Sequence, residues 1–224
     1  MRSAVGALIR KDLLLQRRTP EAVPAMVLFS IGTFVLFHFA LDEREVSGNL
    51  ASGILWVTLL FAAVLGINRL FVSEREEGGF DGFLLAPVDR TSMLVAKAIL
   101  LFLFLSVVEV FVLAAFAILL LGPSPWGPLP ELAVVLALAN AGIAVIGTLV
   151  AALAIQTRAR DLLVPLLALP LSVPLVIAAA RACAPLLTEG GAGALEARWL
   201  AILGLYDLVF GLLAYAIFDF LLEE

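Results

Sequence analysis

Long apolar stretches separated by short polar segments are the dominant pattern of this sequence. Each stretch has about 20 residues or more, which is the length that a helix needs to cross the hydrocarbon core of a bilayer. Because a segment in lipid must satisfy its own backbone polar groups, such stretches form helices. The pattern therefore predicts an all-α membrane protein with six transmembrane helices. We expect the spans at about 22–41, 50–72, 92–121, 131–156, 162–187 and 199–222.

The segment before the first span has a different pattern. Residues 3–18 place apolar side chains on one side of a helix and basic side chains on the other, although Asp12 interrupts the apolar side. Such a helix is typical of the membrane interface. Pro20 then lies where the first turn of the next helix should start. We predict an N-terminal amphipathic elbow helix over 3–18, leading directly into the first span.

Two spans carry unusual residues for a simple apolar helix. The fourth has a stripe of small and polar residues at four-residue steps, from Asn140 to Ala152. This stripe favours helix packing, with a pore wall as the alternative. The fifth has Pro165, Pro170 and Pro174 inside it. Since proline removes a backbone donor and crowds the preceding turn, this span should be kinked or locally unwound.

Composition limits what the chain can do alone. It is 63% apolar and 15% charged, with a mean hydropathy of +1.12, which leaves no room for a sizeable soluble domain. Neither Lys11 nor Lys97 follows a glycine, so the chain has no Walker A loop and we expect no catalytic residues. Cys183 and His38 are single, which excludes an internal disulfide and a zinc cluster within one copy. We predict no enzyme activity, no metal site and no nucleic-acid partner.

The distribution of basic residues predicts the orientation. Only Arg44, Arg181 and Arg198 fall outside if the N-terminus is cytoplasmic. Eleven fall in or beside the inside segments: Arg2, Arg10, Lys11, Arg17, Arg18, Arg69, Arg75, Arg90, Lys97, Arg158 and Arg160. Because cytoplasmic loops carry the excess of Lys and Arg, both termini should be cytoplasmic.

The longest inside segment, 73–90, mixes acidic and aromatic residues. Phe80, Phe83 and Leu84 have the i, i+3, i+4 spacing of one helix face, so a short helix would present an apolar knob beside acidic neighbours. That is suited to a groove on a partner protein; an interfacial helix packed against headgroups is the alternative. We predict a coupling helix that receives motion from an ATPase. Its contact residues would be Glu74, Glu76, Glu77, Phe80, Asp81, Phe83, Leu84, Leu85, Pro87 and Arg90.

Two acidic residues inside spans are candidates for an intramembrane polar site, because charge within a bilayer is costly. Glu109 lies 12 residues beyond Lys97, which is about 18 Å along a helix and close to the midplane. It could line a polar path, pair with a partner subunit, or serve as a structural carboxyl. Asp207 lies about two turns into the last span and is the second candidate.

These features resemble the CcmB family, the heme exporter protein B permeases of cytochrome c maturation within the ABC-2 type permeases. The resemblance runs nearly end to end. It rests on Arg10-Lys11-Asp12, Gly53-Ile54-Leu55-Trp56, Asn68-Arg69-Leu70-Phe71, Leu94-Val95-Ala96-Lys97, the proline-spaced run 162–174 and Trp199-Leu200-Ala201-Ile202-Leu203-Gly204.

The resemblance implies a homodimer of permeases in the bacterial inner membrane, bound to two copies of a CcmA-type ATPase. CcmC- and CcmD-type membrane subunits and the heme chaperone CcmE would complete the system. ATP would be used through the ATPase subunit, and heme would be the exported or handled ligand rather than a bound cofactor. His38, near the outer end of the first span, is then a possible heme contact, because imidazole ligates heme iron; a polar tip at the headgroups is the plainer interpretation.

Two alternatives to this function remain at the level of sequence. One is an ABC-2 efflux permease for another hydrophobic or lipid-linked substrate. The other is a membrane scaffold that transports nothing and organises a heme-handling subunit.

Overall fold

The computed structural model describes residues 2–18, 20–41, 45–71, 90–120, 128–155, 157, 159–188 and 193–221. Over these ranges the chain forms seven α-helices, one 3₁₀ helix and no strand. The helices are α1 (Arg2–Arg18), α2 (Ala22–Ala40), α3 (Gly48–Arg69), α6 (Arg90–Leu119), α7 (Leu129–Ile155), α8 (Arg160–Cys183), η1 (Ala184–Leu187) and α9 (Ala197–Leu221).

Six of these helices are long and apolar enough to cross a membrane. The apolar helical segments are Ala22–Ala40, Gly48–Arg69, Thr91–Leu119, Leu129–Ala154, Asp161–Leu187 and Ala197–Ile217. Each begins within two residues of the span predicted from the sequence. The predicted all-α fold with six spans is confirmed, and the chain is a multi-pass membrane protein.

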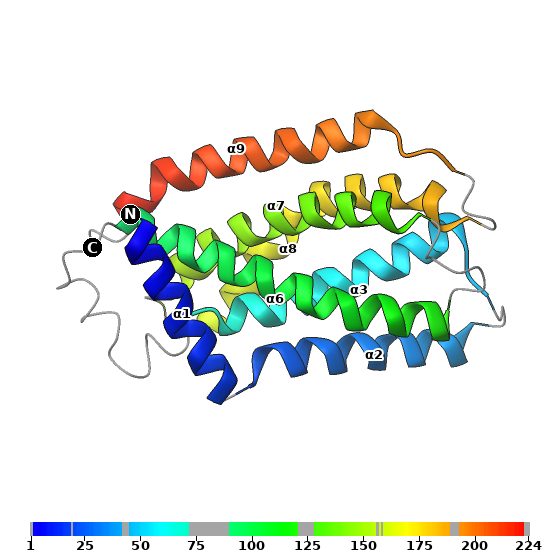
Figure 1. Cartoon of the computed structure of the whole chain (residues 1–224), viewed down its shortest axis with the longest axis horizontal. Helices are drawn as coiled ribbons and strands as arrows, with labels where there is room; N and C mark the ends of the chain where they lie inside the picture. The colour runs from blue at the N-terminus through cyan, green and yellow to red at the C-terminus, as the bar shows by residue number, and fades with distance from the viewer. Residues whose placement is uncertain are drawn as a thin grey trace.

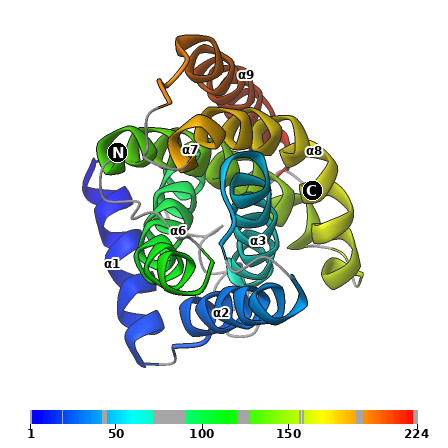
Figure 2. The same cartoon turned by 90° about the vertical axis from the view of Figure 1, so that its right-hand side faces the viewer.

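The six long helices run side by side, and α1 lies across one end of the bundle (Figure 1). Seen along the bundle, α3 lies among α2, α6 and α8, whereas α9 lies at the outer edge (Figure 2). Helix α3 packs against α2, α8 and η1, and α9 packs against α7 and α8. Leu205, Leu208 and Leu212 of α9 are each about 60% exposed. In a bilayer these apolar side chains face lipid or another membrane subunit.

Close helix contacts explain the small-residue stripe of the fourth span. The four residues of the stripe from Asn140 to Ala152 are all buried in α7. On the same helix, a Cβ at Gly147 would lie 2.6 Å from Cγ1 of Ile67 in α3. Small residues let two backbones approach closely, so the stripe packs α7 into the bundle.

The proline-rich helix α8 is not unwound. It continues as one α-helix through Pro165, Pro170 and Pro174, so the unwinding that the sequence left open does not occur. Neighbouring helices supply hydrogen bonds to its carbonyls. Ser52 Oγ of α3 donates to the Ala180 carbonyl at 2.6 Å, and the Tyr206 hydroxyl of α9 donates to the Leu171 carbonyl. The carbonyls that Pro165, Pro170 and Pro174 leave without a helical donor lie four residues before each proline, so these two contacts join α8 to its neighbours rather than replace the missing hydrogen bonds.

Candidate functional site

A buried ion pair joins the elbow helix α1 to the start of the third span. Asp12 of α1 and Lys97 of α6 are only 6% and 3% exposed. Lys97 Nζ lies 2.9 Å from Asp12 Oδ2. Lys11 Nζ approaches the other carboxylate oxygen, Oδ1, at 3.2 Å, but its own side chain is half exposed. The strongest charge contact of α1 is therefore directed into the bundle.

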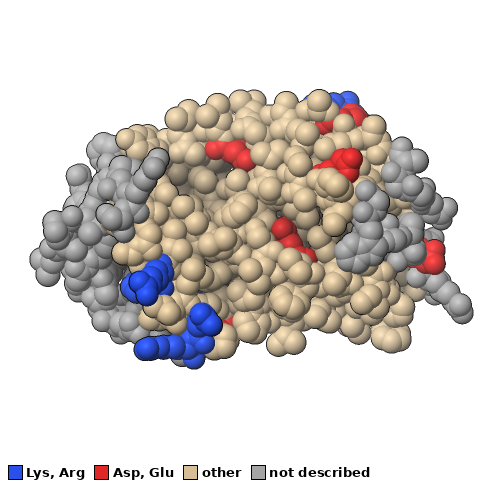
Figure 3. Space-filling model, in the orientation of Figure 1, with Lys and Arg blue, Asp and Glu red and all other residues tan. Residues whose placement is uncertain are grey.

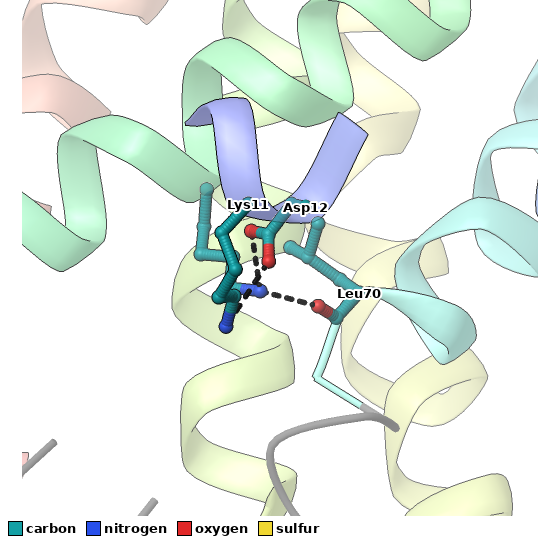
Figure 4. A network of polar contacts seen from close by, with 4 residues as sticks. Lys11, Asp12 and Leu70 are labelled. Atoms are coloured by element: carbon teal, nitrogen blue, oxygen red, sulfur yellow. Dashed lines mark hydrogen bonds and ion pairs between the residues drawn. The ribbon is translucent and has the colours of Figure 1, made fainter. Parts of the chain in front are cut away.

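The same lysine also holds the end of α3. Lys97 Nζ donates a hydrogen bond of 3.1 Å to the carbonyl of Leu70, as Figure 4 shows beside the Asp12 contact. Leu70 is the C-cap of α3, and the last carbonyls of a helix lack partners within that helix. Lys97 Nζ also lies 5.2 Å from the centre of the Phe71 ring, within the range of a cation–π contact.

We call Asp12, Lys97 and the Leu70 carbonyl the anchor. It brings together α1, the end of α3 and the second turn of α6 in one buried contact. Removing one partner of a buried ion pair leaves the other charge without compensation, at a cost of about 3–5 kcal/mol. The three elements therefore hold one another in place at this end of the bundle.

Two parts of the anchor, the Leu70 carbonyl and Lys97, flank the predicted coupling segment 73–90. The predicted contact residues from Glu74 to Pro87 lie outside the described residues, and Arg90 is the first residue of α6. Leu70 lies three residues before that segment, and Lys97 lies seven residues after it. A second pair, Arg69 Nη1 to Glu21 Oε2 at 2.7 Å, links the end of α3 to the start of α2 there; both side chains are more than half exposed, so it contributes little.

The anchor was not among the site residues predicted from the sequence. Asp12 was an interruption of an apolar helix face, and Lys97 was a basic residue flanking a span. A usable signal was present, because each is a lone charge on an otherwise apolar surface and the two are opposite in sign. Ionisable residues in such positions usually pair.

Glu109 lies inside a single copy of the chain, between α6 and α7. It is 7% exposed, and Asn140 Nδ2 donates a hydrogen bond of 2.8 Å to its Oε2 atom. Asn140 is itself 2% exposed. The two side chains form a polar contact between helices that are otherwise apolar, as expected where polar groups join membrane helices.

Asp207 occupies a different place. It is half buried on α9, and its Oδ1 atom would lie 2.5 Å from a Cβ placed on Gly142 of α7. Glu109 contacts α7 at Asn140, two residues away and on another face of that helix. The two predicted intramembrane acids are therefore not brought together into one site.

His38 lies at the opposite end of the bundle from α1. Its Nδ1 atom is 2.6 Å from the Leu119 carbonyl oxygen. This contact joins the ends of α2 and α6. Since a carbonyl only accepts, Nδ1 carries the proton and donates. That tautomer leaves the Nε2 lone pair to accept a hydrogen bond or bind a metal.

Comparison with known proteins agrees with this architecture. A family model described as CcmB protein matches residues 3–220. Heme exporter protein B of Rhodobacter capsulatus is 33% identical over 175 residues, covering 76% of this chain and 78% of the relative. The proteins of the same name from Pseudomonas aeruginosa and Paracoccus denitrificans are 32% identical over 171 residues and 30% identical over 189 residues. These matches cover 76% and 84% of this chain, and 75% and 84% of the relatives. The chain therefore belongs to the CcmB family.

Proposed function

We propose that this chain is the permease subunit of an ATP-driven complex that exports heme, or releases a heme-loaded chaperone, for the biogenesis of c-type cytochromes. The relatives named heme exporter protein B support the substrate, since their matches cover about three quarters or more of this chain. The six spans and the absence of a Walker A loop from the sequence support a membrane subunit that takes its energy from another chain.

The observation that carries the coupling proposal is the anchor. In the proposed mechanism, segment 73–90 docks on a CcmA-type ATPase, and closure of the ATPase pushes this segment. Because Lys97 ties the end of α3 to α1 and α6, a push between α3 and α6 moves three helices together. Packed helices transmit such a displacement by tilting as rigid bodies.

Membership of the CcmB family supports an assembly of several subunits. Two copies of this chain, each one ABC-2 type transmembrane domain over 1–224, would bind two ATPase subunits, with CcmC- and CcmD-type subunits and the chaperone CcmE handling heme. The distribution of basic residues supports the bacterial inner membrane with both termini in the cytoplasm. On the face shown in Figure 3, basic side chains gather towards the end of the bundle where α1 lies, which is the end proposed to meet the ATPase.

The coupling proposal is tested by changing the apolar knob of segment 73–90. Phe83→Asp should lose the co-purifying ATPase and reduce c-type cytochromes in a strain that depends on this chain, because a charge cannot enter an apolar groove without desolvation. Phe83→Leu is the matched control, since it keeps an apolar side chain at the same position. Normal recovery of the ATPase with the Asp variant would contradict the proposed docking.

A further inference from the structure

A cavity of about 480 Å³ opens at the end of the bundle opposite the anchor. The start of α3, the end of α8 with η1, and the start of α9 form its walls. In the proposed orientation this is the outer, periplasmic end. We propose that this cavity binds an amphipathic planar carboxylate, through Arg181 and the apolar wall that includes Trp199, and that the propionate edge of heme is its ligand.

The charges around the cavity point to an anion. Of the three basic residues expected outside, Arg181 and Arg198 both line it. Arg198 is already neutralised, because its Nε atom lies 2.5 Å from Oε2 of Glu196, which also lines the cavity. Arg181 is exposed and makes no ion pair with any residue in the described ranges. The guanidinium of Arg181 is therefore available to bind a carboxylate through two parallel N–H donors.

Figure 3 shows acidic and basic side chains together near the start of α9. The Arg198 guanidinium lies 4.9 Å from the centre of the Trp199 ring, so the paired arginine is held against the indole. The cavity thus has one fixed, neutralised arginine and one arginine that can meet a ligand. This asymmetry directs the ligand's charged edge to Arg181.

The size and lining of the cavity point to more than a simple ion. Its volume lies within the range of about 300–1,000 Å³ that is usual for small-molecule sites. Ala184, Pro185 and Trp199 supply apolar wall next to the polar side chains. A ligand that fills this space needs an apolar body and an acidic edge, and the heme macrocycle with its two propionates has both.

The walls around Arg181 are held by specific contacts. Ser52 Oγ donates to the Ala180 carbonyl at 2.6 Å, directly before Arg181. Thr188 Oγ1 donates to the Pro185 carbonyl at 2.9 Å. The first contact holds the end of α8 against α3, and the second closes η1 on itself, so Arg181 projects from a supported helix end rather than from a loop.

This inference rests on the proposed function for the identity of the ligand, and a binding experiment tests it. The full chain in nanodiscs of zwitterionic phosphatidylcholine is titrated with hemin and with hemin dimethyl ester, in which both propionates are esterified. Arg181→Ala should weaken hemin binding about ten- to hundredfold, since a hydrogen bond to a charged group contributes about 1.5–3 kcal/mol. The same variant should leave the affinity for the ester unchanged.

Two further variants complete the test. Trp199→Leu should weaken both ligands, because it changes the apolar wall and keeps the Arg181 charge. Arg17→Ala removes an exposed charge of the same kind from α1, at the other end of the bundle, and should change neither affinity. Equal hemin affinity in the Arg181→Ala variant and the parent would overturn the proposal.

A phospholipid headgroup is the competing source of an anion. If native mass spectrometry in nanodiscs with added phosphatidylglycerol shows a bound lipid that Arg181→Ala loses, while hemin affinity is unchanged, the site is a lipid site and the heme proposal is wrong. Failure of the proposed function gives a different result, because a strain lacking the chain would then still make c-type cytochromes whatever the hemin titration shows.

Discussion

The anchor yields a quantitative prediction for Lys97→Met. The substitution keeps most of the side-chain volume but removes the partner that lies 2.9 Å from Asp12 Oδ2 and the donor to the Leu70 carbonyl. Among the described residues, Asp12, at 6% exposure, would keep the half-exposed Lys11 as its cationic partner. Leaving one charge of a buried pair uncompensated costs about 3–5 kcal/mol. For a chain of this size, 1 kcal/mol lowers Tm by about 2–4 °C, so we expect a loss of about 6–20 °C.

The chain contains its own reporter for this measurement. Cys183 is the single cysteine of the sequence and is fully buried. A thiol-reactive fluorogenic dye will therefore label it only when the bundle opens. Heating the detergent-solubilised parent and variants in the presence of the dye gives Tm from the rise in fluorescence.

The double variant Asp12→Leu/Lys97→Met separates the ion pair from simple loss of packing. Each single change leaves one buried charge, whereas the double change leaves none, so the double variant should recover most of the lost Tm. Lys11→Met is the matched control, and it should change Tm by only a few degrees because its charge is half exposed. A Lys97→Met variant that melts within about 2 °C of the parent, which is about the measurement error, or a double variant with additive losses, would contradict a stabilising ion pair between Asp12 and Lys97.

Three further outcomes follow from the surroundings of single residues in the helices, and each is measured by the same labelling of Cys183. Gly147→Ala should cost about 1–3 kcal/mol, because its Cβ would lie 2.6 Å from Ile67; an unchanged Tm would contradict that contact. Gly211→Ala, where nothing lies within 4 Å of the added Cβ, should raise stability by about 0.5–1 kcal/mol, and a clear loss would count against the described position of α9. Asn140→Leu should cost about 1–3 kcal/mol by removing the donor to Glu109, whereas Glu109→Gln, which keeps an acceptor, should cost less; the reverse order would be evidence against the hydrogen bond.

The spans were predictable because their signal is local. The start of a membrane-spanning helix is marked by the change from polar to apolar residues. The six apolar helices of the structure all begin within two residues of the predicted spans. Whether α8 stays continuous through its prolines could not be predicted from its own residues alone. Pro165, Pro170 and Pro174 favour a kink or local unwinding, but α8 continues as one helix where it packs against α3, α7 and α9.

The polar contacts were not predictable in the same way, because they join residues far apart in the sequence. Asp12 and Lys97 meet only because α1 packs against α6. Glu109 could have paired with another subunit on sequence grounds, whereas its partner Asn140 is 31 residues away in the same chain. Arg181 and Arg198 could be assigned to the outside from the sequence, but their shared cavity depends on how α8 and α9 are placed beside α3.

The proposed role as the permease of an ATP-driven heme exporter is best tested by purifying the chain from its native membrane in mild detergent. Co-purifying subunits are identified by mass spectrometry, and the visible absorption spectrum of the complex is recorded. We expect a soluble ATPase together with a heme-bearing membrane subunit and its Soret band. An ATPase without heme proteins would contradict the heme export function, and the absence of any ATPase would contradict the assignment of an ATP-driven permease.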